Sequence, residues 1–386
     1  MKLAATAIAL LLALTAEAAG KSQRPSVLGI VWYGATTEVV KLDALTLRPI
    51  SRRARVDEPS WFIARSPARQ RAVFTVGASQ DRLRFLDVRR MRFAGGVGIG
   101  HVQGWLWRDA HRLVLVAGGE EPSVYLVDPL TRQVRLMRKL DGSVTAVARS
   151  AAWLVALLTP KNHIGPARLA IIDGEANVRE VALPGVRAGW QVIDPSSYRS
   201  REELPGLAIN PSGSRIIVVT AAGSIAEVNL ETLRIALHTT KARTLARRQK
   251  TLEGWVRSAA WFGRDLVAVT GNDFSLEGDS VRVTPAGVTL IDTSDWSTRT
   301  MEPLARYAAV AGDTLLVCGA GLSGYGPDGT KRFHLFGQQD VPYVQILAGY
   351  VYLAAKNNTR YTIVDPHLGG VLKRVSTPNI TTLADG

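Results

Sequence analysis

An apolar strand followed by a turn recurs eight times in this sequence, ends in an aspartate in six of the eight copies, and constrains the fold more than any other feature. The weakest copy is Leu322-Ser323-Gly324-Tyr325-Gly326. The steps between equivalent positions are 44, 41, 45, 56, 63, 34 and 39 residues, close to the length of one small antiparallel sheet. The equivalent positions are Asp43, Asp87, Asp128, Asp173, Asn229, Asp292, Gly326 and Asp365.

Each copy contains more than one strand. A second apolar run, such as Ala72–Val76 or Leu154–Leu158, precedes the motif and lacks strict alternation, which is typical of strands buried on both faces. A shorter strand such as Leu207–Ile209 comes before it, and the strand after the turn completes a set of four. The pattern predicts an all-β fold, a single β-propeller of four-stranded blades. The count favours eight blades, and seven is the alternative if the Leu322 region is an insertion or a terminal repeat is irregular.

The two ends of the repeat array complement one another. The chain enters at Val27–Trp32, a second-type strand with no inner strand before it, and the tail Asn379–Leu383 follows a complete last blade. We expect this C-terminal strand to supply the missing one and to close the ring, which removes exposed sheet edges. The predicted propeller domain is 19–386.

The repeated aspartates suit a structural role better than a catalytic one. An aspartate or asparagine at the end of a strand accepts hydrogen bonds from backbone N–H groups just ahead and stabilises a turn. Pro129 and Pro366, one residue later, fix the backbone angle that such a turn requires.

The stretch Ala72–Gly100 resembles one unit of the YVTN-type propeller repeats in its strand, small-residue loop, aspartate-terminated strand and turn. The segment Leu207–Arg215 resembles the inner strand and turn of WD-like extracellular propellers. These similarities imply the fold and carry almost no information about chemistry.

The first eighteen residues are predicted to be an export signal. Lys2 is followed by the apolar run Leu3–Leu14, too short to span a bilayer, and then by the cleavage pattern Ala16-Glu17-Ala18. We therefore expect a secreted or periplasmic protein without stable membrane insertion. The lone Cys318 lies in an apolar run and is expected to be buried and unreactive.

The formal charge of +14 favours anionic partners. In an exported protein this indicates an acidic surface polymer or a protein partner, and we expect no nucleic acid.

Insertions interrupt the repeat on one side of the predicted ring. They are Pro160–Ala167, Gly185–Leu204, His238–Gly254 and Gly271–Gly287, and the meander of a blade brings all four to one rim over blades four to six. The candidate ligand-binding residues in them are Trp190, Asp194, Tyr198, Arg199, Arg201, Arg243, Arg247 and Arg248.

Metal or cofactor chemistry has little support in the sequence. Asp273, Glu277 and Asp279 offer oxygen ligands that suit calcium, but their spacing is not that of an EF-hand loop. No pair of histidines has metal-ligand spacing, and no nucleophile elbow or phosphate-binding glycine loop is present. No cofactor is predicted, and calcium is the metal that the carboxylates suggest; a zinc or copper site would have to be assembled by the fold from distant residues.

These features favour a noncatalytic binding scaffold that presents the charged rim of blades four to six to an anionic or protein partner. The alternative is an enzyme of lactonase-like or quinoprotein-like type with a site at the mouth of the ring. The Gly-Trp that typically follows the turn in quinoprotein repeats is absent here.

Overall fold

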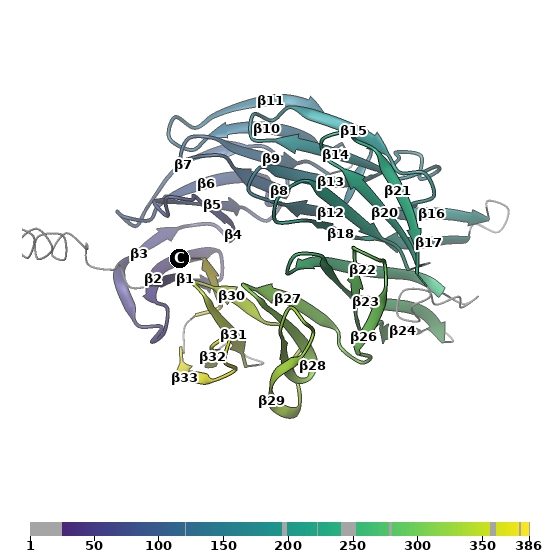
Figure 1. Ribbon diagram of the computed structural model, residues 1–386. Helices are drawn as coiled ribbons and strands as arrows, with labels where there is room; N and C mark the ends of the chain where they lie inside the picture. Colours follow the sequence, from purple (N-terminus) through teal and green to yellow (C-terminus); the bar gives the residue numbers. More distant parts are fainter. Residues whose placement is uncertain are drawn as a thin grey trace, which may run out of the picture.

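The computed structural model shows a ring of antiparallel sheets (Figure 1), and it describes residues 25–119, 121–194, 199–221, 223–240, 252–277, 280–355, 360–377 and 380–385. The predicted export signal and the basic run 241–251 lie outside the described residues. The described strands form eight sheets, and each sheet is called a blade below, numbered in chain order. No helix in these ranges is long and apolar enough to cross a membrane.

The first four blades are regular. Blade 1 combines β1 (Ser26–Tyr33), β2 (Thr36–Asp43) and β3 (Pro49–Val56) with β34 (Thr382–Asp385). Blade 2 contains β4 (Ser60–Arg65), β5 (Arg71–Val76), β6 (Arg82–Asp87) and β7 (Arg92–Gly98). Blade 3 contains β8 (Val102–Trp107), β9 (Leu113–Ala117), β10 (Ser123–Asp128) and β11 (Gln133–Lys139). Blade 4 contains β12 (Ser143–Arg149), β13 (Trp153–Thr159), β14 (Arg168–Asp173) and β15 (Val178–Ala182).

The second half of the chain contains the two irregular sheets, blades 6 and 7. Blade 5 is regular, with β18 (Gly206–Ile209), β19 (Arg215–Val219), β20 (Ser224–Asn229) and β21 (Ile235–Thr239). Blade 6 is enlarged and contains β16 (Gly189–Asp194), β17 (Arg199–Leu204), β22 (Leu252–Phe262), β23 (Leu266–Glu277), β24 (Ser280–Pro285), β25 (Val288–Asp292) and β26 (Thr298–Glu302). Blade 7 contains β27 (Tyr307–Ala311), β28 (Thr314–Tyr325) and β29 (Lys331–Asp340). Blade 8 contains β30 (Gln345–Leu347), β31 (Tyr350–Ala354), β32 (Arg360–Val364) and β33 (Val371–Ser376).

The weak repeat around Leu322 belongs to blade 7. There, β28 pairs with β27 through its first half and with β29 through its second half. Arg332, just beyond the turn after β28, donates to Thr314 Oγ1 at 2.9 Å, so the two ends of β28 lie close together. A straight strand of 12 residues would separate them by about 36 Å. The element therefore doubles back, with Gly321 in the left-handed region (φ 81°), and it supplies two strands of an ordinary blade.

Both faces of the blades are buried. In β13, Leu154, Ala156 and Leu158 pack against blade 3, while Val155 and Leu157 pack against blade 5. The same arrangement recurs around the ring, because each of the eight apolar clusters among the described residues is shared by two successive blades. Continuous apolar strands are the sequence signature of this two-sided burial, as predicted.

The C-terminal strand closes the ring. β34 pairs antiparallel with β1, from Val27 opposite Asp385 to Ile30 opposite Thr382. Across the junction between the last blade and the first, the Tyr352 hydroxyl donates to the Ala44 carbonyl at 2.6 Å. The predicted fold class, an all-β propeller of four-stranded blades closed by the C-terminal strand, is confirmed.

The repeated aspartates make turns, also as predicted. Asp128 Oδ1 accepts hydrogen bonds from the N–H groups of Leu130 (2.7 Å) and Thr131 (3.3 Å). Asn229 Oδ1 likewise accepts a hydrogen bond from the N–H group of Thr232 at 2.8 Å. Four residues after each of them, Arg132 (φ 63°) and Leu233 (φ 57°) adopt the left-handed conformation, and their N–H groups bond back to the carbonyls of Asp128 and Asn229. The turn is thus fixed at both its side chain and its backbone.

We predict that Asp128→Ala lowers the free energy of unfolding by about 1–3 kcal/mol, because the N–H groups of the turn lose a charged acceptor. Asp128→Asn, which copies the natural Asn229 turn, should recover most of the loss. Chemical denaturation of the three proteins measures this, and an Asp128→Ala variant as stable as the parent would contradict the structural role.

Cys318 is buried between blades 7 and 8. Burial raises the pKa of its thiol to about 12. We therefore predict that the folded protein does not react with a thiol reagent at pH 8 and reacts fully once it is unfolded in denaturant. Rapid labelling of the folded protein would show that the junction between blades 7 and 8 opens in solution.

Candidate functional site

The insertions extend the sheet of blade 6 beyond its four blade strands. The hairpin β16–β17 comes from the connection between blades 4 and 5, but β17 pairs in parallel with β22 of blade 6, Glu202 lying opposite Gly254. The second half of β23 then pairs with β24, Glu277 opposite Ser280. Strands β16, β17, β22, β23 and β24 therefore run side by side, and we call them the insert sheet (Figure 1).

One contact fixes this sheet to blade 4. The buried Thr159, at the end of β13, donates from its hydroxyl to the Ala188 carbonyl at 2.7 Å. The next residue, Gly189, has φ 75°, and a Cβ there would lie 2.3 Å from Thr159 Oγ1. Only glycine allows the chain to turn this closely over Thr159 before β16 begins.

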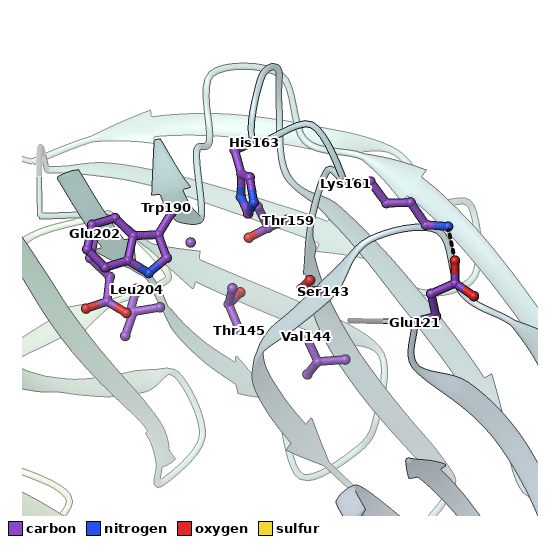
Figure 2. A pocket seen from close by; sticks show the side chains of 11 residues that line it. Glu121, Ser143, Val144, Thr145, Thr159, Lys161, His163, Trp190, Glu202 and Leu204 are labelled. Carbon is purple, nitrogen blue, oxygen red and sulfur yellow. Dashed lines mark hydrogen bonds and ion pairs between the residues drawn. The ribbon is translucent and has the colours of Figure 1, made fainter. Parts of the chain in front are cut away.

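A cavity of about 700 Å³ lies between the hairpin and blade 4 (Figure 2). On one side, Trp190 and Glu202 are directly opposite each other in the β16–β17 ladder, so their side chains share a face. On the other side lie the first residues of β12, the end of β13 and the loop that follows it. The cavity is lined by Glu121, Ser143, Val144, Thr145, Thr159, Lys161, His163, Gly189, Trp190, Glu202 and Leu204.

The lining combines polar and apolar surface, with a single large aromatic ring. Trp190 is 54% exposed, so its indole is available to a ligand. Lys161 is already paired with Glu121 at 3.0 Å, which leaves the two charges nearly balanced at that end (Figure 2). The Thr145 hydroxyl donates to the Leu157 carbonyl at 3.2 Å and keeps its lone pairs for other donors.

Glu203 lies in the same hairpin as Glu202. Burial raises the pKa of Glu203, although Arg201 and Arg187 oppose the shift. Its carboxyl group thus titrates closer to neutrality than an exposed glutamate does.

The structure places part of the predicted ligand set at this site. Trp190 lines the cavity, and Arg201 lies in β17 within the insert sheet. Asp194 and Arg199 lie in β16 and β17, while Tyr198, Arg243, Arg247 and Arg248 lie outside the described residues. Sequence reasoning did not single out Thr145, Thr159 or Glu202, because they lie in regular strands and carry no local signal.

The carboxylates suggested for calcium have other partners. Asp273 is 3% exposed, and its Oδ1 lies 2.7 Å from Nη2 of the fully buried Arg257. Arg257 also donates to the carbonyls of Val256 and Asn272. Glu277 pairs with Arg282 at 2.5 Å, and Asp279 lies outside the described residues. Within the described part of the chain, no group of three or more His, Cys, Asp or Glu side chains could hold a metal ion.

Comparisons with known proteins give the fold alone. No protein-family model and no curated protein matches the sequence. The dihydro-heme d1 dehydrogenase NirN is a similar solved structure, with a TM-score of 0.61 and 11% identity over 95% of this chain and 76% of that chain. AztD from Citrobacter koseri is another, with a TM-score of 0.55 and 11% identity over 93% of this chain and 96% of that one.

We predict that Arg257→Leu lowers the free energy of unfolding by about 3–5 kcal/mol, since it leaves the Asp273 carboxylate buried without its cation. Arg264→Leu is the matched control, because Arg264 is 96% exposed and its ion pair should contribute little. Urea denaturation compares the two variants.

The parent protein, without substitutions, tests the calcium hypothesis. With Asp273 and Glu277 both paired to arginines, we expect neither calcium nor a chelator to move the thermal midpoint. A calcium-dependent rise of several degrees would contradict this and would restore a cation site.

Proposed function

We propose that this chain is an exported, noncatalytic binding scaffold that captures an anionic or protein partner at the rim formed by the insert sheet. The observation that carries the proposal is the assembly of insertions from separate connections into one hydrogen-bonded sheet that walls a cavity. Additions at one rim of a rigid ring are the usual place of recognition in repeat folds.

The chemistry of the cavity supports binding. It joins an exposed indole, hydroxyl groups and charged groups of both signs, a combination suited to holding a polar ligand in one orientation. The described residues offer no metal cluster and thus no support for the lactonase-like alternative. Membership of the YVTN-type repeat class is part of the same proposal and rests on the strand and turn pattern.

The basic run between blades 5 and 6 supplies the long-range attraction in this proposal. Arg243, Arg247 and Arg248 follow β21, whose last residue is Thr239, and precede β22 of the insert sheet. A cluster of positive charge beside a binding surface raises the rate at which an anionic partner arrives.

We predict that the triple variant Arg243→Glu, Arg247→Glu and Arg248→Glu elutes from a sulfated-polysaccharide column at clearly lower salt than the parent, while its thermal midpoint stays unchanged. The control is the triple variant Arg89→Glu, Arg90→Glu and Arg92→Glu, which makes the same change of charge at exposed positions of blade 2. Equal losses in both variants would show a general effect of net charge and would remove the localised basic arm from the proposal.

A further inference from the structure

A second cavity, of about 1000 Å³, lies between the last two blades. It opens at the same rim as the first, because its lining comes from the second half of β29 and the connection after it, the end of β31, the start of β32 and the end of β33. The residues that matter here are Tyr343, Arg360, Thr362, Arg374 and Ser376. None of them belongs to the insertions or to the site described above.

The β32–β33 ladder places four polar side chains on one face. Arg360 is opposite Ser376, and Thr362 is opposite Arg374. Opposite residues share a face of the sheet, and so do residues two apart along a strand. The two arginines are therefore diagonal neighbours flanked by two hydroxyl groups, and all four line the cavity.

In blade 4, the equivalent two positions hold side chains of opposite charge. In the β14–β15 ladder, Arg168 is opposite Ala182 and Ala170 is opposite Glu180, so Arg168 and Glu180 occupy the positions of Arg360 and Arg374. Both Arg168 and Arg360 stand five residues before the turn aspartate of their blade. The charged groups of Arg168 and Glu180 lie 3.8 Å apart, so side chains at these positions can meet, although Asp141 is nearer to Arg168 (2.7 Å) and Arg138 is nearer to Glu180 (3.3 Å).

Blade 8 replaces the acidic member of this pair with a second arginine. Within the described residues, neither Arg360 nor Arg374 forms a hydrogen bond or ion pair through its guanidinium. The carboxylate among the lining residues is Asp340, and it faces Arg306 at 3.7 Å. Both arginines are exposed, and two like charges on neighbouring strands repel each other, a repulsion that a bound anion relieves.

We propose that this cavity binds a small organic phosphate. Arg360 and Arg374 hold the phosphate group from two sides, since a guanidinium presents paired donors that match phosphate oxygens. Thr362 and Ser376 donate the remaining hydrogen bonds from their hydroxyls. Tyr343, which is 47% exposed, and Phe336 form an aromatic wall for the organic part of the ligand. The volume exceeds the needs of inorganic phosphate and suits a ligand with such a part.

The test uses phenyl phosphate as the probe, measured by isothermal titration calorimetry on the full chain. We expect saturable binding by the parent protein, binding weakened by about tenfold or more in Arg374→Glu, and an intermediate affinity in Arg374→Lys, which keeps the charge but loses the paired donors. Arg374→Glu recreates the blade 4 pair, so its thermal midpoint should be no lower than that of the parent. If this variant fails to fold, Arg360→Gln gives the same measurement.

Three results would overturn the proposal. Phenol binding as tightly as phenyl phosphate would show that the phosphate group is not recognised. Benzoate binding more tightly than phenyl phosphate would assign the cavity to carboxylates. Equal affinity of the parent and Arg374→Glu for phenyl phosphate would place its binding elsewhere. Because no residue of the insert sheet takes part, each result is independent of the proposed function of the rim.

Discussion

The structure depends on the two-sided burial of each blade. A strand such as β13 packs alternate side chains against the blade before it and the blade after it, so a blade with only one neighbour would expose an entire apolar face. Each fully buried aliphatic side chain contributes about 2 kcal/mol only when the blade that it faces is present. The ring must therefore close, and the pairing of β34 with β1 provides the closure.

In a ring of this kind, the turns on one rim keep a fixed length, whereas the connections on the other rim can vary in length. On the rim opposite the insertions, turns such as that of Asp128 are short and repeat the same hydrogen bonds. Each of these turns connects two adjacent strands of one blade, whose spacing is fixed by their pairing. On the other rim, connections between blades and between middle strands can lengthen without moving the strands. Both cavities lie on this second rim, so the proposed binding surfaces are on one side of the ring and the structural turns are on the other.

The sequence predicts the elements whose causes are local. The apolar runs and turn aspartates are sufficient to derive the blades, because each depends on residues within about forty positions. Closure joins the two ends of the chain, and the prediction of it came from the first strand, which has no inner strand before it, and from the strand left over after the last blade. The site is less predictable. The parallel pairing of Glu202 with Gly254 joins segments from different blades, and the partner of Asp273 is Arg257, across a hairpin. The exposed Trp190 was found from its insertion alone, whereas the hydroxyls of Thr145 and Thr159 were not, since residues of this type also occur throughout ordinary strands.

Repetition provides a second way to recognise function once the register is known. Arg360 and Arg374 are unremarkable in the sequence, and an arginine near the end of a strand is common in this chain. They become informative only when blade 4 is aligned in register, because Arg168 and Glu180 then show that the same two positions can hold opposite charges. In a repeat protein each blade is an internal reference for the others. Where blade 4 has a pair of opposite charges, blade 8 has two arginines beside a cavity, and a bound anion would relieve their repulsion, which links this difference between two blades to binding.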